Sequence, residues 1–293
     1  MVRKKNILVT GSDGQLGKTL KYLVNDYAIY NFYFKNKLEL DISNFSKTKN
    51  YIINNNIDII INCAAYTDVE KSEINFELAN LINHLSVDNL AFVCKENDIQ
   101  LIHISTDFVF DGKKLSAYHE NDRANPLNVY GKTKLEGEKK ILKYNLSGSI
   151  ILRTSWLYSN FKGNFVTKVI ENLSSSTTVN MVDNEIGSPT SALDLAVAIL
   201  KIIPILSNKV PEIYHFANSG FCSRFEFACK INKLINGKNS INPVNDNSRK
   251  FKRPNFSCLD NTKISKVFNL NIKDWSISLE YYFKNFNFVL NEI

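Results

Sequence analysis

Residues 7–17 read Ile7-Leu8-Val9-Thr10-Gly11-Ser12-Asp13-Gly14-Gln15-Leu16-Gly17, and this stretch decides the fold. Its first four residues have the continuous apolar character of a parallel strand that is buried on both faces. Leu16, Leu20 and Leu23 then recur at helical spacing. The glycines therefore stand at a strand-to-helix junction, where a dinucleotide pyrophosphate can approach bare backbone and meet the helix N-terminus.

Further apolar runs follow at intervals along the chain. They cover residues 29–34, 57–62, 101–105 and 150–153, and polar or helix-patterned stretches separate them. Strands that alternate with helices predict a parallel sheet with helices on both faces. The sequence therefore predicts an α/β fold with a Rossmann-like, doubly wound parallel sheet.

The strand-helix alternation weakens after Arg153. The segment 187–190 precedes a predicted helix over residues 192–203, which Pro204 ends. We expect a smaller C-terminal lobe here, with a strand at residues 213–217 and helices at residues 224–236 and 276–286. We place the dinucleotide-binding domain at residues 1–155 and the smaller lobe mainly at residues 156–293.

Tyr130 and Lys134 form a Tyr-x-x-x-Lys pair. Residues 129–140 have the Lys/Glu-rich composition of a helix, so two side chains four residues apart share one face. A phenol has an unperturbed pKa of roughly 10, and a neighbouring ammonium stabilises its anion. The spacing indicates a Tyr that transfers a proton and a Lys that lowers its pKa, although an isolated pair of this kind is usually a surface feature.

Small and polar residues follow two of the predicted core strands. In an open α/β sheet, ligands gather beyond the carboxyl ends of the strands. Ala64 and Ala65 follow the strand at 57–62, and their small side chains allow close approach to a cofactor. Thr106 and Asp107 follow the strand at 101–105. Thr and Asp are also common turn residues, but their position upstream of the Tyr/Lys pair favours a functional site.

These motifs resemble the extended branch of the short-chain dehydrogenase/reductase superfamily, and within it the dTDP-4-dehydrorhamnose reductase family. The resemblance runs nearly end to end and is carried by residues 11–17, 62–70, 105–112, 126–138, 153–156 and 253–260. It implies NAD(P)H-dependent reduction of the 4-keto group of dTDP-4-dehydro-6-deoxy-L-mannose (dTDP-4-dehydrorhamnose) to dTDP-L-rhamnose. Such a reaction belongs to nucleotide-sugar and cell-surface polysaccharide biosynthesis.

The resemblance also implies a role for each matching residue. Tyr130 becomes the general acid, Lys134 the cation that lowers its pKa and bonds the nicotinamide ribose, and Thr106 the hydroxyl that orients the carbonyl. The cofactor-binding positions are Gly11, Gly14, Gln15, Leu16, Gly17, Asp41, Ile42, Ala64, Ala65, Tyr66, Tyr130 and Lys134. The substrate positions are Thr106, Asp107 and Trp156, although a Trp is most often a core or hinge residue. The smaller lobe is expected to bind the nucleotide sugar, with some of its segments returning to the first domain.

The choice between NADPH and NADH is predicted from an acidic residue that this sequence lacks. The Asp or Glu that usually holds an NAD ribose about 20 positions after the glycine turn is absent. Lys35 and Lys37 stand there instead. Either lysine can meet the 2′-phosphate of NADP, so we predict NADPH, with NADH as the alternative. Both lysines can also be plain surface charges.

One segment departs from the family pattern, so the sequence does not decide the identity of the sugar substrate. Where the family usually has Asp-Gln-x-Gly-x-Pro-Thr, this chain has Asn184-Glu185-Ile186-Gly187-Ser188-Pro189-Thr190. Another nucleotide-linked 4-ketosugar is therefore an alternative substrate.

Two other functions are alternatives to reduction. A nucleotide-sugar epimerase or dehydratase shares the turn and the Tyr/Lys pair, but dehydratases commonly have Asp-Glu after the catalytic Thr, whereas Asp107-Phe108 follows Thr106 here. A non-catalytic regulatory subunit is the alternative from another class, and the retained Thr106, Tyr130 and Lys134 argue against it.

Composition limits the remaining possibilities. The chain has 293 residues, no visible signal peptide and no run near the ~20 apolar residues of a membrane span, so we expect a cytoplasmic protein without membrane contact. Its net charge of +7 comes from scattered lysines, so no nucleic-acid partner is predicted. The cluster at residues 249–253 can hold RNA or a nucleotide diphosphate, and the resemblance favours the diphosphate.

Metal and disulfide sites are not expected. The four histidines have no ligand spacing, and the five cysteines include no Cys-x-x-Cys pair. The resemblance implies a homodimer.

Overall fold

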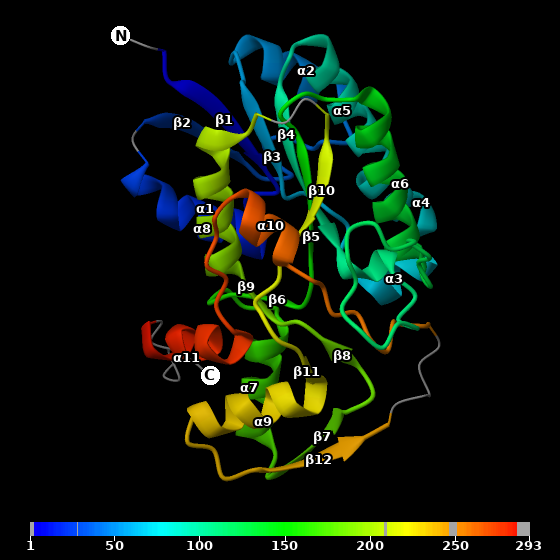
Figure 1. Ribbon diagram of the computed structural model, residues 1–293, viewed down its shortest axis with the longest axis vertical. Helices are drawn as coiled ribbons and strands as arrows, with labels where there is room; N and C mark the ends of the chain where they lie inside the picture. Colours follow the sequence, from blue (N-terminus) through cyan, green and yellow to red (C-terminus); the bar gives the residue numbers. More distant parts are fainter. Residues whose placement is uncertain (1–2, 28, 208–209, 246–250, 286–293) are drawn as a thin grey trace.

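The computed structural model describes residues 3–27, 29–207, 210–245 and 251–285, and its centre is a six-stranded sheet (Figure 1). The strand order is β10-β5-β4-β3-β1-β2, and each neighbouring pair is parallel. The strands are β1 (Lys5–Thr10), β2 (Tyr30–Lys35), β3 (Ile59–Asn62), β4 (Gln100–Thr106), β5 (Ile150–Thr154) and β10 (Glu212–His215). The predicted Rossmann-like, doubly wound α/β fold is confirmed.

Apolar side chains of the strands divide between two helical layers. Ile7, Val9 and Ile61 point to one face, where they pack with α1 (Gln15–Leu23) and α8 (Ala192–Ile202). Leu8 and Ile60 point to the opposite face, which α2 (Phe45–Asn54), α5 (Ser86–Glu96) and α6 (Val129–Tyr144) cover. Because both faces are covered, the strands are apolar throughout, as the sequence pattern predicted.

The strand predicted at residues 213–217 is in this sheet and not in the smaller lobe. β10 pairs with β5, residue for residue from Glu212–Ile150 to His215–Arg153. The assignment to the smaller lobe was wrong because a short apolar run indicates a strand without indicating its neighbour. Helix α8 likewise packs on the main sheet. Pro204 lies in the 3-10 turn η4 (Ile203–Ile205) that follows it.

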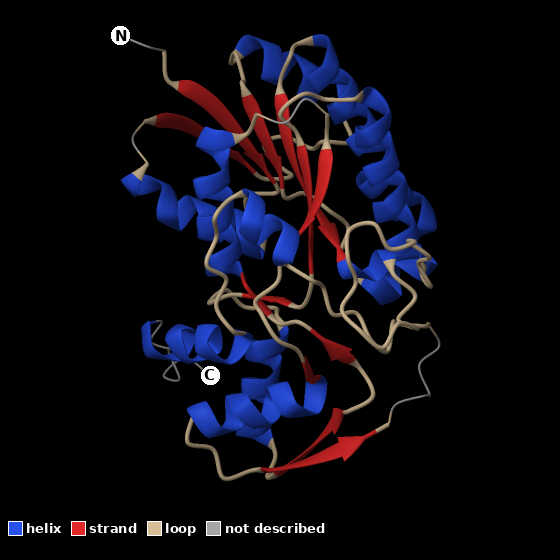
Figure 2. Cartoon of the chain, viewed as in Figure 1, coloured by secondary structure: helices blue, strands red, loops and turns tan. Residues whose placement is uncertain are grey.

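The smaller lobe lies beyond the carboxyl ends of the strands (Figure 2). It contains α7 (Phe165–Ser175), β7 (Thr178–Val182), β8 (Ile186–Gly187), β11 (Cys222–Ser223), α9 (Arg224–Leu234), β12 (Ser240–Val244) and α11 (Trp275–Asn285). β7 pairs with β12 and β8 with β11. Tyr158, Phe227 and Leu279 lie in its own buried core. The boundary between residues 155 and 156 stays a proposal.

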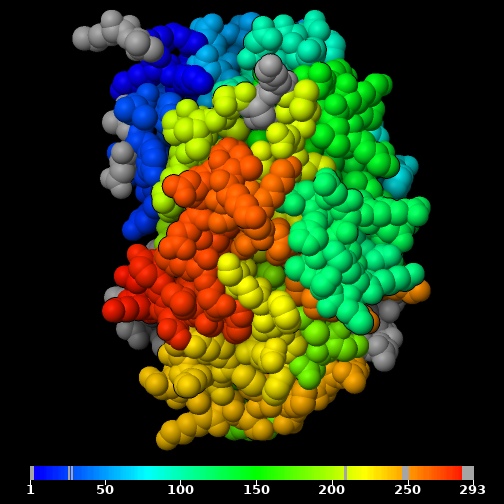
Figure 3. Space-filling view, in the orientation of Figure 1, coloured from blue at the N-terminus to red at the C-terminus, as the bar shows by residue number. Residues whose placement is uncertain are grey.

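The remaining elements are short. They are η1 (Val24–Asp26), α3 (Val69–Ile74), α4 (Phe76–Asn80), the π-helix η2 (Leu81–Leu85), η3 (Asp107–Val109), β6 (Leu157–Tyr158), β9 (Thr190–Ser191) and α10 (Thr262–Val267). Figure 3 shows the C-terminal segment, in orange and red, covering one face from the main sheet to the smaller lobe. Within the described residues, no helix is long and apolar enough to cross a membrane.

A buried ion pair fixes α6 to the sheet. Arg153 of β5 donates to both carboxylate oxygens of Glu138, with Nη2 2.6 Å from Oε2 and Nε 3.0 Å from Oε1. The Ser105 hydroxyl also donates to Glu138. Only 3% of the Arg153 side chain and 1% of the Glu138 side chain are exposed, so each charge depends on the other for stabilisation.

Replacing Glu138 with Gln should therefore destabilise the protein by about 3–5 kcal/mol, because Arg153 is left as an uncompensated buried charge. The matched control is Glu136→Gln on the same helix, which removes the exposed pair with Lys139 and should change stability by less than about 1 kcal/mol. Urea unfolding of the two variants measures both values. Equal losses of unfolding free energy would contradict this role for the buried pair.

Candidate active site

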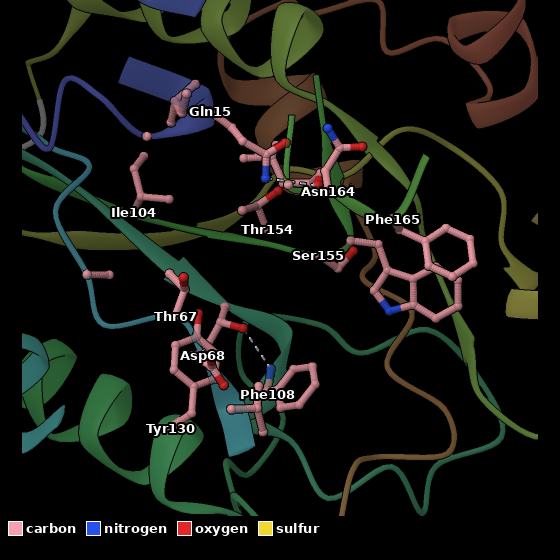
Figure 4. A pocket seen from close by; sticks show the side chains of 18 of the residues that line it. Gln15, Thr67, Asp68, Ile104, Phe108, Tyr130, Thr154, Ser155, Asn164 and Phe165 are labelled. Carbon is pink, nitrogen blue, oxygen red and sulfur yellow. Dashed lines mark hydrogen bonds between the residues drawn. The ribbon is translucent and has the colours of Figure 1, made fainter. Parts of the chain in front are cut away.

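A cavity of about 1250 Å³ lies between the main sheet and the smaller lobe. The predicted site residues that line it are Gly11, Gly14, Gln15, Leu16, Gly17, Asp41, Ile42, Ala64, Ala65, Thr106, Asp107, Tyr130, Lys134 and Trp156. In Figure 4, Gln15 and Asn164 lie on one side of this cavity, and Thr67 and Tyr130 lie on the other. One cavity thus brings the three sequence motifs together.

Tyr66 is the predicted residue that does not line the cavity. Its backbone N–H donates to Asn83 Oδ1 at 2.8 Å, and its hydroxyl accepts from Asn75 Nδ2 at 3.4 Å. The loop after β3 therefore directs Tyr66 toward helical neighbours and presents Ala64, Ala65 and Thr67 to the cavity. Adjacent positions in this loop were indistinguishable from sequence.

The glycine turn is shaped by contacts that no side chain permits. Gly11 has φ of +63°, and an added Cβ would lie 2.6 Å from the backbone nitrogen of Ala64. At Gly17 an added Cβ would lie 2.6 Å from the Gly11 carbonyl oxygen. The turn can therefore pack closely, and α1 begins at Gln15 with its N-terminus at the cavity. Exposed backbone N–H groups and the helix dipole suit an anionic group there.

Helix α6 is held against the end of β4. The Asn128 side chain caps its N-terminus by accepting from Gly131 N at 2.9 Å. At Gly131 an added Cβ would lie 2.1 Å from the Phe108 carbonyl oxygen. The Phe108 and Tyr130 rings meet edge to face, with centroids 5.7 Å apart. This close packing places Tyr130 beside Thr106.

Burial shifts the pKa values of both Tyr130 and Lys134. Burial raises the pKa of Tyr130 to about 12; the Thr106 hydroxyl opposes this rise and Asp107 adds to it. Burial lowers the pKa of Lys134 to about 8, against the opposing effects of Glu138 and Cys63. Burial disfavours the charged form of each group, and the predicted effect of Lys134 on the phenol pKa stays a prediction. Tyr130 consequently keeps its proton at neutral pH.

Thr106 and Asp107 form a polar pair next to this phenol. The Thr106 hydroxyl donates to Asp107 Oδ1 at 3.1 Å and accepts from Phe108 N at 3.1 Å. Asp107 is 2% exposed, and burial raises its pKa to about 6 although bonds to Ser257 and Thr106 oppose the rise. The Thr106 hydroxyl is thus held at the cavity wall with a defined orientation.

The smaller lobe contributes a cation that sequence reasoning missed. Arg224 begins α9, and its guanidinium carbon lies 3.4 Å from the Trp156 ring centroid. Its Nε lies 3.7 Å from Glu185 Oε2. Trp156 has φ of +45°, and Gly187 lies directly against its ring. No sequence motif marked Arg224, because its partners are distant in the chain.

The two lysines predicted to select the cofactor differ in whether they line the cavity. Lys37 lines the cavity. Lys35 does not; its ammonium lies 3.7 Å from Glu39 Oε1 and 5.3 Å from the Tyr51 ring centroid. Arg253 of the basic cluster also lines the cavity and pairs with Glu70 at 3.3 Å. Arg249 and Lys250 lie outside the described residues. Within the described ranges, no group of three metal-ligating side chains comes together.

Comparison with known proteins identifies the family. Residues 5–288 match the model described as RmlD substrate binding domain. The chain is 35% identical over 285 residues to a dTDP-4-dehydrorhamnose reductase from Aggregatibacter actinomycetemcomitans, covering 94% of this chain and 97% of that protein. The chain belongs to the dTDP-4-dehydrorhamnose reductase family. The resemblance found in its motifs is therefore confirmed.

Two further members of this group bear on the site. A crystal structure of dTDP-4-dehydrorhamnose reductase from Bacillus anthracis in complex with NADP has a TM-score of 0.91, is 34% identical, and covers 96% of this chain and 99% of its own. A dTDP-4-keto-6-deoxy-D-glucose reductase from Streptomyces niveus is 31% identical over 231 residues, 78% of each protein. Relatives of this chain are thus named as reductases of two different 4-ketosugars.

The departure from the reductase pattern lies at the cavity wall. Glu185 lines the cavity, and its backbone carbonyl accepts from Arg224 N at 3.2 Å. Its carboxylate faces the guanidinium that covers Trp156. The exchanged acid therefore lies where the smaller lobe can contact a substrate.

Proposed function

We propose that this protein is an NADPH-dependent oxidoreductase that reduces the 4-keto group of dTDP-4-dehydrorhamnose to dTDP-L-rhamnose. The observation that carries the proposal is the placement of the Tyr130 phenol beside Thr106, in the cavity that the glycine turn shares with the smaller lobe. A ketone reductase needs a proton donor at this place. The reductase names of the relatives and the NADP in the Bacillus anthracis structure support it.

The residues of the cavity fit a dinucleotide. The turn from Gly11 to Gly17 leaves the close space that a Cβ would fill, and α1 directs its N-terminus there. Asp41 and Ile42 lie where the adenine side is expected, and Lys37 is the cation for a 2′-phosphate. When bound, NADPH supplies the hydride that reaches the ketone carbon.

The chain itself supplies the proton and the orientation. Tyr130 donates its phenolic proton to the carbonyl oxygen as negative charge develops there. Thr106 orients that oxygen through its hydroxyl. Lys134 lies next to Tyr130, on the buried side of the phenol. Asp107, Trp156 and the rest of the smaller-lobe wall surround the nucleotide sugar and exclude water from the reacting atoms.

The identity of the sugar is a second question. The Streptomyces niveus relative and the changed Glu185 favour a related 4-ketosugar as the second candidate. A panel of nucleotide-linked 4-ketosugars, each assayed with NADPH and NADH, tests both candidates. Epimerases and dehydratases share the glycine turn and the Tyr/Lys pair, but dehydratases commonly have Asp-Glu after the catalytic Thr, whereas Asp107-Phe108 follows Thr106 here. Turnover of any ketosugar excludes a regulatory subunit. The homodimer and the cytoplasmic location stay predictions.

Tyr130→Phe should lower kcat for ketosugar reduction by ~100- to 10,000-fold, the usual contribution of a general acid. NADPH affinity should stay nearly unchanged, because the ring remains. Tyr144→Phe, at the far end of the same helix, is the matched control and should retain activity. A loss of less than about tenfold in Tyr130→Phe would remove this residue from the mechanism.

Lys37→Ala should weaken NADPH binding by about 10- to 150-fold, since one charge-assisted phosphate contact is worth about 1.5–3 kcal/mol. NADH binding should hardly change, because NADH lacks the 2′-phosphate. Lys35→Ala removes a cation two residues away that pairs with Glu39, so it serves as the control. Titration of both cofactors by fluorescence measures these affinities. The cofactor assignment fails if the unaltered protein binds NADH more tightly than NADPH.

A further inference from the structure

Arg224 is a cation that its neighbours hold in one place at the cavity wall. Its guanidinium carbon lies 3.4 Å from the centroid of the Trp156 ring and 4.7 Å from that of the Phe165 ring. Its Nε lies 3.7 Å from Glu185 Oε2, and only 15% of the side chain is exposed. Two aromatic rings and a carboxylate therefore restrict where the guanidinium can lie.

The backbone at Arg224 is fixed as well. The preceding strand β11 pairs with β8, with Ser223 opposite Ile186. A capping box starts α9, because Ser223 Oγ accepts from Glu226 N at 3.0 Å and Ser223 N donates to Glu226 Oε2 at 2.8 Å. The position of Arg224 is thus set by the protein alone, before any ligand binds.

The guanidinium keeps its hydrogen-bonding capacity for the cavity that it lines. A guanidinium has five N–H donors and no acceptor. The separation of 3.7 Å from Glu185 is too long for a hydrogen bond, and the Arg224 side chain donates none to the other described residues. Donors that the described protein leaves unused at a cavity wall suit a ligand with acceptor oxygens.

The charges around Arg224 favour an anionic ligand. Burial lowers the pKa of Arg224 to about 10, with Glu185 and Asp107 opposing the fall, so the group is a cation at neutral pH. Arg253 lines the same cavity, and its charge adds to the lowering of the Arg224 pKa. Two cations that repel each other at one cavity are both stabilised when an anion binds there.

Arg224 lies between the two ends of the substrate cavity. At one end is Tyr130, where the proposed function places the keto group, and Figure 4 shows Phe165 on the opposite side. Arg224 contacts Trp156, which follows β5, and Phe165, which begins α7. Beyond them α7 and β7 line the cavity with Val169, Asn172, Asn180, Met181 and Val182. In a nucleotide sugar, the group between the sugar and the nucleoside is the diphosphate.

We propose that Arg224 binds the diphosphate of the nucleotide-sugar substrate. The inference rests on the proposed function and adds the residue that anchors the substrate in the smaller lobe. A planar guanidinium presents two parallel N–H groups, which match two oxygens of one phosphate group. An anchored diphosphate limits how far the sugar can move, so its keto group stays within reach of Tyr130.

Calorimetric titration with dTDP tests the proposal without turnover. The protein is first saturated with NADP, so that the glycine turn is not open to a second nucleotide. Arg224→Met keeps an apolar stem between the two rings and removes the charge. It should weaken dTDP binding by about 10- to 150-fold, the contribution of one charge-assisted contact, and should leave NADP affinity unchanged. Unchanged dTDP affinity would overturn the proposal and make Arg224 a packing residue.

The product dTDP-L-rhamnose distinguishes a diphosphate contact from a sugar contact. Arg224→Met should weaken dTDP and dTDP-L-rhamnose by the same factor, because the contact is with the group that both ligands share. A loss for dTDP-L-rhamnose without a loss for dTDP would assign Arg224 to the sugar and overturn the proposal.

Lys230→Met is the matched control on the same helix. Lys230 pairs with Glu280 at the surface, so its removal changes the net charge equally and should leave dTDP affinity unchanged. Equal losses in Lys230→Met and Arg224→Met would indicate a general effect of net charge and refute the role of Arg224.

A second pair of variants covers a failure to fold, because Arg224→Met leaves Glu185 without its guanidinium neighbour. Glu185→Gln/Arg224→Met removes both charges and is compared with Glu185→Gln alone. The same difference of about 10- to 150-fold in dTDP affinity is expected, and no difference would overturn the proposal. Arg224-dependent binding of dTDP without turnover of any ketosugar would refute the proposed function and leave the diphosphate site intact.

Discussion

The contact between Gly131 of α6 and the Phe108 carbonyl is the constraint on which the site depends. Only a residue without a side chain allows the helix to approach the end of β4 so closely. Residues 130, 134 and 138 are four apart and share one face of this helix. That face presents a phenol to the cavity, the Lys134 Nζ to His103 and the Ile104 carbonyl, and a carboxylate to Arg153. One close approach thus positions three different polar groups.

Burial then decides the chemistry of these groups. The same loss of water raises the pKa of Tyr130 and lowers that of Lys134, so both are driven toward their neutral forms. A neutral phenol is a proton donor, and a donor is what a ketone needs when it accepts hydride.

Much of the fold and the site was predictable because it depends on local pattern. Continuous apolar runs predicted the parallel strands, and the glycine spacing predicted the junction with α1. The remaining features depend on contacts between distant segments. β10 joins the main sheet through β5, and Arg224 reaches Trp156 across the smaller lobe. Lys37 lines the cavity, whereas Lys35 contacts Glu39 and Tyr51 instead. A pKa direction requires the three-dimensional surroundings, which is why the rise that burial causes in the Tyr130 pKa was not predicted.

The central claim is that Tyr130 is a protonated phenol at working pH. Ultraviolet difference spectra between the unaltered protein and Tyr130→Phe isolate the ionisation of this one tyrosine from that of the others. With a pKa of about 12, Tyr130 should give no tyrosinate absorption near neutral pH, and its signal should appear only at strongly alkaline pH. A tyrosinate band near neutral pH that disappears in Tyr130→Phe would contradict the claim.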